Sequence, residues 1–383
     1  MAPIVIVGAG MAAYGVAREF RKLDKVTPLL IIAGDAAGSY SKPMLSNAIA
    51  MGKEASQLVS HSAEQMAVQL DAVVLPHTRA TAIDSGARTI TTTGGSFEYS
   101  QLVLALGATP IRLPMGGDAT GEVLSVNHID DYVQLRARLG QVGRAAHVAI
   151  IGAGLIGCEF ADDLLAGGHA VTLVDPNLHP LAALAAPSLS RGLAKAWQGK
   201  PVTLKLGTTV SSVWNSAGGL RLDLADGTSL LADVVLSAVG LRPSITLAQA
   251  ALIETQRGIL VDAYGRTSAT NIFALGDCAQ YSTANGSAVM PYVAPLLAAA
   301  RAIASTLAGK PLPIDLKNEA VIVKTPSYKL ALAPPPVGIA GAWVDEHDDE
   351  RTISRFVDAT GAIRGFGLSA HTLALRQKLL AEM

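Results

Sequence analysis

Apolar residues along the chain gather in short runs that alternate with segments of helical spacing. Two such runs, residues 4–7 and 148–151, each precede a glycine turn and then a stretch whose apolar positions repeat with the helical period. A second apolar run follows each stretch, at residues 29–32 and 171–174. A strand, a helix and another strand in this order form a βαβ unit, so the sequence predicts an α/β fold with two units of the same design.

Two further buried strands are predicted at residues 102–106 and 234–239, and each ends in a turn. The pattern changes towards the C-terminus. From residue 316 onward the strands become short and alternating, and residues 353–358 and 363–368 flank a predicted hairpin turn. A final helix is predicted from about residue 371. We therefore expect a small α+β domain at the C-terminal end.

Composition narrows the class of protein. The 30 lysine and arginine residues balance 31 aspartate and glutamate residues, so the basic excess of a nucleic-acid-binding protein is missing. Charged residues make up 16% and hydrophobic residues 50%, which excludes a disordered chain. Residues 291–307 are the most hydrophobic long stretch, but Pro291, Pro295 and Arg301 favour a buried helix over a membrane span. We expect a soluble, cytoplasmic protein.

Metal and disulfide chemistry find little support in the sequence. The eight histidines show no ligand spacing, and two cysteines cannot make a disulfide framework or a four-ligand zinc site. The acidic run at residues 345–350 lacks the spaced ligands and glycine of a calcium loop, so a solvated loop is expected there. No metal site is predicted.

The first glycine loop contains Gly8, Gly10 and Ala13. Gly8 permits a tight turn, Gly10 lets the backbone approach a pyrophosphate, and the small Ala13 allows close packing of helix on strand. The N–H groups that begin the helix would bind the phosphates. The next strand should end in an acid that binds a ribose, and Asp35 is the carboxylate near that position, because Ala33 stands where a glutamate is common.

The second loop, with Gly152, Gly154 and Gly157, is a complete dinucleotide fingerprint. Asp175 ends the next strand 23 residues after Gly152, close to the roughly 20-residue spacing expected for an acceptor of the ribose 2′-hydroxyl. A carboxylate there would repel a 2′-phosphate, and residues 176–178 supply no arginine to receive one. This loop therefore favours NADH over NADPH.

A third element is the strand at residues 270–275 that ends in Gly276 and Asp277. Taken alone, Asp277 is better explained as a helix N-cap. Beside two glycine loops, it becomes a candidate acceptor for a hydroxyl group of a ligand.

These motifs, in this order, resemble those of the FAD-dependent pyridine-nucleotide reductases over essentially the whole chain. The resemblance implies that the Gly8 loop binds the FAD pyrophosphate, that Asp277 holds the flavin ribitol and that the Gly152 loop binds NADH. It also implies an FAD-binding domain in two pieces, residues 1–113 and 244–314. An NADH-binding domain, residues 114–243, would lie between them, and residues 315–383 would form a C-terminal interface domain.

Within that family, residues 39–46, 156–161, 323–326 and 333–336 are similar to the rubredoxin reductases. This similarity implies NADH:rubredoxin oxidoreductase activity, with rubredoxin as a one-electron acceptor, and an alkane-oxidation context. It also implies that Lys42 and Glu159 form an ion pair near flavin N5 and act as the catalytic residues, by tuning the cofactor. Lys324 would reach the same cofactor, and Ala80 would border the adenine.

Motifs and resemblance together predict a set of cofactor-binding residues. They are Gly8, Ala9, Gly10, Met11, Ala12, Ala13, Asp35, Lys42, Pro43, Ala80, Ala105, Gly107, Gly152, Gly154, Leu155, Ile156, Gly157, Glu159, Asp175, Gly240, Gly276, Asp277, Val289 and Lys324.

The two cysteines separate this chain from the disulfide-reducing branch of the family. The flavin-facing residues 40–46 contain no cysteine, and Cys158 and Cys278 are interpreted as buried packing residues. Electrons would then leave the flavin directly. Three alternatives share the motifs: a ferredoxin reductase of an oxygenase system, a cysteine-free NADH oxidase, and a flavoprotein that binds NADH as a sensor or interaction module.

Overall fold

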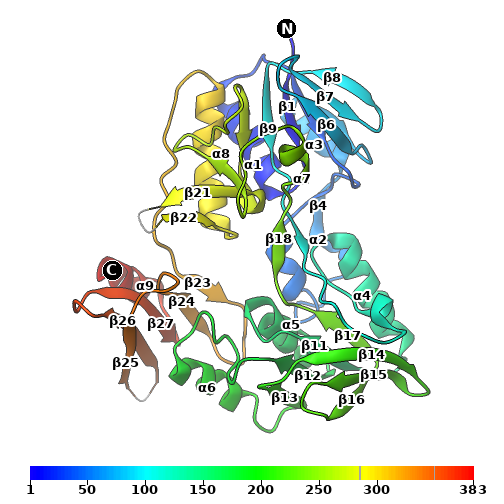
Figure 1. Ribbon diagram of the computed structural model, residues 1–383, viewed down its shortest axis with the longest axis vertical. Helices are drawn as coiled ribbons and strands as arrows, with labels where there is room; N and C mark the ends of the chain where they lie inside the picture. The colour runs from blue at the N-terminus through cyan, green and yellow to red at the C-terminus, as the bar shows by residue number, and fades with distance from the viewer. Residues whose placement is uncertain (284–285, 349) are drawn as a thin grey trace. The chain divides into compact units, whose positions relative to one another are not determined.

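A computed structural model describes residues 1–283, 286–348 and 350–383, and these divide into two compact units (Figure 1). The first unit contains Met1–Lys42, Ser56–Thr109 and Leu241–Lys317. The second contains Pro43–Ala55, Pro110–Gly240 and Asn318–Met383. The finer division into four segments that the resemblance implies stays a prediction.

A five-stranded parallel sheet forms the centre of the first unit, in the order β20-β9-β1-β2-β5. Its strands are β1 (Ile4–Val7), β2 (Leu29–Ile32), β5 (Val73–Leu75), β9 (Gln101–Leu104) and β20 (Ile272–Ala274). Val7 lies opposite both Ile32 and Leu104 in register, so the strands end at one common edge. The continuous apolar runs of β1 and β2 are buried throughout, as expected for strands covered on both faces.

Two helices pack together on this unit, α1 (Met11–Leu23) and α8 (Val293–Leu307), which lie side by side in Figure 1. Gly15 allows their close approach, because a Cβ atom there would lie 3.3 Å from the Ala300 Cβ. The alanine-rich α8 is largely buried, as the sequence predicts. None of the helices in the described ranges is long and apolar enough to cross a membrane.

Shorter elements complete the first unit. They include α3 (Ala63–Leu70), α7 (Thr246–Ala250), the antiparallel sheet of β6 (Ala80–Asp84), β7 (Thr89–Thr92) and β8 (Gly95–Glu98), and the sheet of β19 (Ile259–Val261), β21 (Ala279–Thr283) and β22 (Gly286–Val289). The segments that join the units contain two pairs of strands and one short helix. The pairs are β3 (Ser39–Tyr40) with β4 (Val59–His61) and β10 (Ala108–Pro110) with β18 (Leu241–Pro243), and the helix is α2 (Ala55–Leu58).

The second unit contains the second predicted βαβ unit. A parallel sheet in the order β13-β12-β11-β17 is formed by β11 (His147–Ile151), β12 (Ala170–Asp175), β13 (Val202–Leu206) and β17 (Val234–Ser237). The helix α5 (Leu155–Ala166) connects β11 to β12. Further elements are α4 (Ile129–Gln141), α6 (Pro187–Ala196) and the antiparallel sheet of β14 (Val210–Ser216), β15 (Gly219–Leu224) and β16 (Ser229–Ala232).

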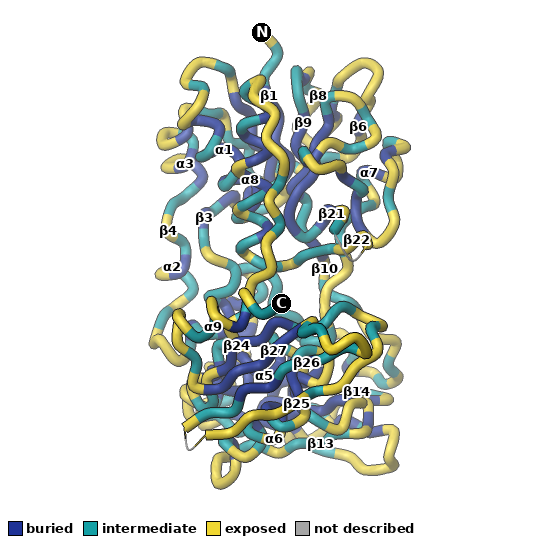
Figure 2. Tube along the Cα trace, turned by 90° about the vertical axis from the view of Figure 1, so that its left-hand side faces the viewer, coloured by how far each residue is buried: buried dark blue, intermediate teal, exposed yellow. Residues whose placement is uncertain are grey.

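The C-terminal residues form an antiparallel sheet in the order β23-β24-β27-β26-β25. Its elements are β23 (Val321–Val323), β24 (Leu330–Ala333), β25 (Gly341–His347), β26 (Thr352–Asp358), β27 (Ile363–Ser369) and the helix α9 (Leu373–Ala381). The predicted β26–β27 hairpin and the final helix are both confirmed. Figure 2 shows β24 and β27 buried, whereas β25 is mostly exposed.

One expectation was wrong in part. Asp345 and Glu346 of the acidic run lie in β25 rather than in a loop. Their carboxylates stay exposed to solvent but have cross-strand partners on β26, because Ser354 donates to Asp345 and Arg355 forms an ion pair with Glu346. Residue 349 of the run lies outside the described residues.

Candidate functional site

The first glycine turn connects β1 to α1. Gly8 has a φ of +118°, and a Cβ atom there would lie 2.3 Å from the carbonyl oxygen of Ala105, so only glycine fits. Gly10 is the N-cap of α1, and no described side chain caps this helix. No described atom lies within 4 Å of a Cβ built on Gly10. The first N–H groups of α1 are therefore available to a phosphate, and Ala13 is buried beneath them.

The Gly-Asp motif meets this turn within the first unit. Gly276 has a φ of +75°, and a Cβ atom there would lie 3.1 Å from the Ala12 Cβ. The adjacent Asp277 carboxylate lies 3.6 Å from the Lys42 ammonium, and both side chains remain partly exposed. The structure thus brings together three segments that the sequence singled out separately.

The ribose-binding position after β2 is less regular. One oxygen of Asp35 accepts a hydrogen bond from the Ala37 N–H at 2.8 Å, which fixes the carboxylate in a local turn. Arg79, immediately before Ala80, lies over the neighbouring Gly34, 3.8 Å from a Cβ built there. Sequence reasoning missed Arg79, because no spacing rule connects residue 79 to the end of β2.

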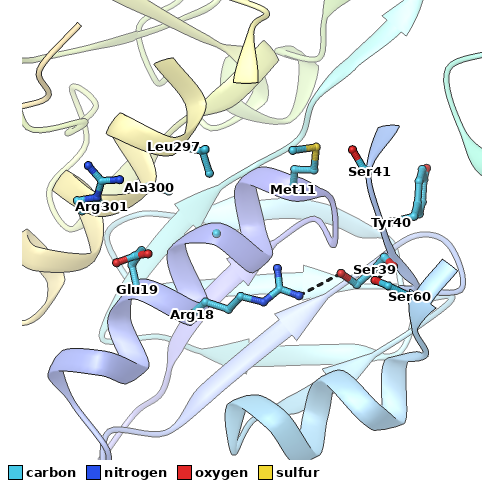
Figure 3. A pocket seen from close by; sticks show the side chains of 11 residues that line it. Met11, Arg18, Glu19, Ser39, Tyr40, Ser41, Ser60, Leu297, Ala300 and Arg301 are labelled. Carbon is cyan, nitrogen blue, oxygen red and sulfur yellow. Dashed lines mark hydrogen bonds between the residues drawn. The ribbon is translucent and has the colours of Figure 1, made fainter. Parts of the chain in front are cut away.

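A pocket of about 300 Å³ lies on the outer side of α1, against α8 and the segment Ser39–Ser41 (Figure 3). It begins at Met11, next to the glycine turn, and carries Arg18 and Arg301. Arg18 donates to the Ser39 hydroxyl at 3.2 Å, the dashed line in Figure 3. This bond ties β3 to α1 and so helps to fix the segment that leads into Lys42.

The second glycine turn repeats the same design in the second unit. Gly152 has a φ of +103°, and a Cβ atom there would lie 2.7 Å from the Ala238 carbonyl oxygen. A Cβ on Gly157 would lie 1.9 Å from the Gly152 oxygen, so α5 can pack this close to the turn only with glycine. Gly154 is the N-cap of α5, again without a cap from any described side chain.

Asp175 ends β12 beside this turn, as the spacing predicts, and is buried. One carboxylate oxygen accepts the Ala153 N–H at 2.7 Å. The other accepts both the backbone N–H and the side-chain amide of Asn177, each at 2.8 Å. Asn177 therefore orients the carboxylate, a role that no motif in the sequence indicates.

Three carboxylates on α5 bind other segments of the second unit; we call Glu159, Asp162 and Asp163 the α5 acidic row. Glu159 is 1% exposed and forms an ion pair with the Lys324 ammonium at 2.6 Å. It also accepts hydrogen bonds from the Ser46 hydroxyl at 2.6 Å and the Lys324 N–H at 3.0 Å.

The other two members of the α5 acidic row act in the same way. Asp162 accepts the indole N–H of Trp197 and the N–H of Ser327, both at 2.8 Å. Asp163 accepts the N–H groups of Ile49 and Ala50 at 3.2 and 2.7 Å. Burial raises the pKa of Asp163 to about 6, and these two N–H groups oppose that rise.

The ion pair expected between Lys42 and Glu159 would join one unit to the other, and it stays a prediction. Within each unit, the structure gives Asp277 as a partner of Lys42 and Lys324 as a partner of Glu159. Lys324 also donates to the Ser46 hydroxyl and to the carbonyl oxygen of Pro43.

The remaining predicted positions lie at turns or at the ends of strands and helices. Ala9, Met11 and Ala12 lie in the first glycine turn and the start of α1, Leu155 and Ile156 begin α5, Ala105 and Gly107 follow β9, Gly240 precedes β18, and Val289 ends β22.

Both cysteines are buried and free, as the sequence predicts. Burial raises the pKa of the Cys158 thiol, and it raises the pKa of the Cys278 thiol to about 11. Thiols that stay protonated at neutral pH are poor nucleophiles. The site therefore does not contain the reactive cysteine of a disulfide-exchanging enzyme among its described residues.

Two glycine turns, each at the start of a helix with unblocked N–H groups, are typical of a protein with two dinucleotide-binding sites. The chain belongs to the pyridine nucleotide-disulphide oxidoreductase family, whose model matches residues 2–299. This membership implies FAD and NADH as cofactors. A second family model, described as a rubredoxin binding C-terminal domain, matches residues 313–383.

Curated relatives match the whole length of the chain. The rubredoxin-NAD(+) reductase of Alcanivorax borkumensis is 40% identical over 100% of this chain and 99% of its own length. The rubredoxin-NAD(+) reductase of Acinetobacter baylyi is 38% identical over 100% and 98%. The nitric oxide reductase FlRd-NAD(+) reductase of Aeromonas salmonicida is 35% identical over 99% and 96%.

Solved structures agree on the fold. Putidaredoxin reductase, in its covalent complex with putidaredoxin, has a TM-score of 0.89 at 24% identity and covers 100% of this chain and 94% of its own. The reductase Fdr9 has a TM-score of 0.85 at 27% identity, with coverage of 100% and 95%. The predicted architecture of two Rossmann-like domains and a small C-terminal α+β domain is thus confirmed.

Proposed function

We propose that the chain is an NADH:rubredoxin oxidoreductase. One observation carries the proposal: the full-length similarity, at 40% and 38% identity, to two reductases named for rubredoxin extends into the rubredoxin binding C-terminal domain at residues 313–383. The buried cysteines support it, because electrons can reach a partner protein without a reactive thiol.

The residues of the two glycine turns fit two dinucleotides. The open N-termini of α1 and α5 supply N–H donors and a positive dipole end for two pyrophosphates. Asp175, held by Asn177, would accept the hydroxyl groups of the NADH ribose and repel a 2′-phosphate. Lys42 and Asp277 would contact FAD in the first unit, and Lys324 is a further residue proposed to contact it.

When bound, FAD accepts a hydride from NADH and releases electrons singly to an acceptor. The overall reaction balances if one NADH reduces two one-electron rubredoxins and one proton is released. No side chain has to act as a general acid or base. Lys42 and Lys324 would supply positive charge, and Glu159 holds the Lys324 ammonium by their contact at 2.6 Å.

An acceptor comparison tests this function. The purified holoenzyme is reduced with NADH under anaerobic conditions and is then mixed with oxidised rubredoxin or with a two-iron ferredoxin. Fast reoxidation by rubredoxin and slow reoxidation by ferredoxin is the expected result. Reoxidation by ferredoxin alone would assign the chain to an oxygenase system, and a stable NADH complex with neither acceptor would favour a binding protein.

The nucleotide preference has its own test. Replacing Asp175 by Ala should raise the KM for NADH at least tenfold, equivalent to about 1.4 kcal/mol, with FAD still bound. Asn177→Ala should raise it less, because the carboxylate stays present and loses only the side-chain amide donor, while the backbone N–H of residue 177 remains. Unchanged NADH kinetics in both variants would refute the assignment of this site.

A cytoplasmic location and a role in alkane oxidation complete the proposal. Two free cysteines and no disulfide among the described residues are typical of a reducing compartment. The pathway rests on resemblance to rubredoxin reductases alone.

A further inference from the structure

Ser46 is a buried serine outside the set of predicted cofactor-binding residues. It ends the short helix η1 (Lys42–Ser46) and is 3% exposed. Its hydroxyl donates to one carboxylate oxygen of Glu159 at 2.6 Å and accepts a hydrogen bond from the Lys324 ammonium at 2.8 Å. A single hydroxyl group therefore contacts both members of the buried ion pair.

The Lys324 ammonium is fully coordinated within the second unit. A lysine ammonium has three protons to donate, and its acceptors here are the Ser46 hydroxyl, the Glu159 carboxylate and the Pro43 carbonyl oxygen. The backbone N–H of Lys324 donates to the other oxygen of Glu159 at 3.0 Å. Because these donors are engaged, Lys324 would act on a bound flavin through its charge rather than through a further hydrogen bond.

The same ammonium binds both ends of η1. It holds the carbonyl oxygen of Pro43 near the start of this helix and the hydroxyl of Ser46 at its end. The ring of Pro43 fixes its own φ, so the chain has little freedom at this point once the carbonyl oxygen is held. Lys42 is joined directly to Pro43, and its backbone direction is therefore set by this contact.

We infer that Ser46 is a positioning residue for the two lysines proposed to act on the flavin. Its hydroxyl holds the Lys324 ammonium against the Pro43 carbonyl oxygen and so fixes the start of η1, where Lys42 stands. This inference rests on the proposed placement of Lys42 and Lys324 at FAD. Cations that are already held in place stabilise a developing negative charge without reorganisation, which is why their position matters for the rate.

The variant Ser46→Ala tests this role on the full holoenzyme, with Ser190→Ala as the matched control. Ser190 also lies in the second unit, is 0% exposed, and its hydroxyl has no hydrogen-bond partner among the described residues. Anaerobic stopped flow with NADH measures the rate constant of flavin reduction and the Kd for NADH separately. Ser46→Ala should lower the rate constant about tenfold and change the Kd by less than about twofold, whereas Ser190→Ala should leave both unchanged.

Two further measurements separate positioning from a purely structural role. The midpoint potential of bound FAD should fall in Ser46→Ala, because loosely held cations stabilise the reduced flavin less, and Ser46→Thr should restore both the potential and the rate. In a Lys324→Met background, Ser46→Ala should lower the rate by less than about a further twofold, since no ammonium remains to be held.

A Ser46→Ala variant with the wild-type reduction rate and potential would overturn the positioning role, even if its thermal unfolding midpoint fell. An additional loss of about tenfold in the Lys324→Met background would overturn it as well. Wild-type potentials in both Lys42→Met and Lys324→Met would overturn the proposed placement of the lysines, and this inference with it. These measurements follow only the reaction with NADH, so failure of rubredoxin as acceptor is detected separately.

Discussion

The ion pair between Glu159 and Lys324 makes a strong prediction about stability. Lys324→Met keeps an unbranched apolar side chain close in length to the lysine stem and removes its ammonium. Glu159, 1% exposed, would retain its hydrogen bonds from the Ser46 hydroxyl and the residue 324 N–H but lose the Lys324 ammonium that lies 2.6 Å away. Removal of one partner from a buried pair costs about 3–5 kcal/mol, because the remaining charge is left uncompensated.

The exposure of Lys324 moves the expectation to the lower end of that range. Its side chain is 26% exposed, so water can partly replace the ammonium. We expect a loss of about 3 kcal/mol from the unfolding free energy of the second unit. At roughly 2–4 °C per kcal/mol for a unit of this size, the midpoint of thermal unfolding should fall by about 6–12 °C.

Tryptophan fluorescence is a suitable assay, because Trp197, Trp214 and Trp343 all belong to the second unit. The surface variant Lys195→Met is the control and should shift the midpoint by no more than about 2 °C. The double variant Lys324→Met/Glu159→Gln should recover most of the loss, since an uncharged amide no longer needs a cation. A midpoint shift below about 2 °C for Lys324→Met, or no recovery in the double variant, would refute the reasoning.

Three further predictions concern the glycine turn, the cysteines and pH. Gly157→Ala places a Cβ atom 1.9 Å from the Gly152 oxygen, so we expect about 1–3 kcal/mol of lost stability and a higher KM for NADH, measured by thermal unfolding and steady-state kinetics. Iodoacetamide at pH 8 should leave activity unchanged and Cys158 and Cys278 unlabelled in mass spectra, because burial raises the pKa of both thiols; rapid inactivation would contradict this. Asp163 has a pKa of about 6 when folded, above its ordinary 3.8, so its contribution to stability is present below about pH 4 and is lost as pH rises through 6. As pH rises from 4 to 6, the wild type should therefore lose up to about 3 kcal/mol of unfolding free energy that the variant Asp163→Asn keeps. Unfolding midpoints of both proteins, measured as a function of pH, check this difference.

The sequence predicted what is decided locally. Gly8 and Gly152 occupy tight turns between a strand and a helix, and such turns depend on a few adjacent residues. The position of Asp175 followed from its distance along the chain to the second loop, and the structure places it beside that loop. The hairpin of β26 and β27 followed from alternating apolar positions, which also act over short distances.

Contacts between distant parts of the chain were beyond such reasoning. Ser46 and Lys324 reach Glu159 from 113 and 165 residues away, and no periodicity in the sequence connects them. The same holds for Asp163 and its two N–H partners at Ile49 and Ala50. Family resemblance identified Glu159 and Lys324 as important residues, but their mutual contact comes from the structure.

The α5 acidic row has a consequence for protein engineering. The helix that would receive NADH at its N-terminus also binds, through Glu159 and Asp162, the segment at Lys324 and Ser327, which follows β23 of the C-terminal sheet. A chimera that exchanges this domain to serve another electron carrier would need to keep both hydrogen bonds, from the N–H of residue 324 to Glu159 and from the N–H of residue 327 to Asp162. Grafts that begin at residue 328 or later should assemble more readily than grafts that begin at residue 318, since they leave the attachment to α5 intact.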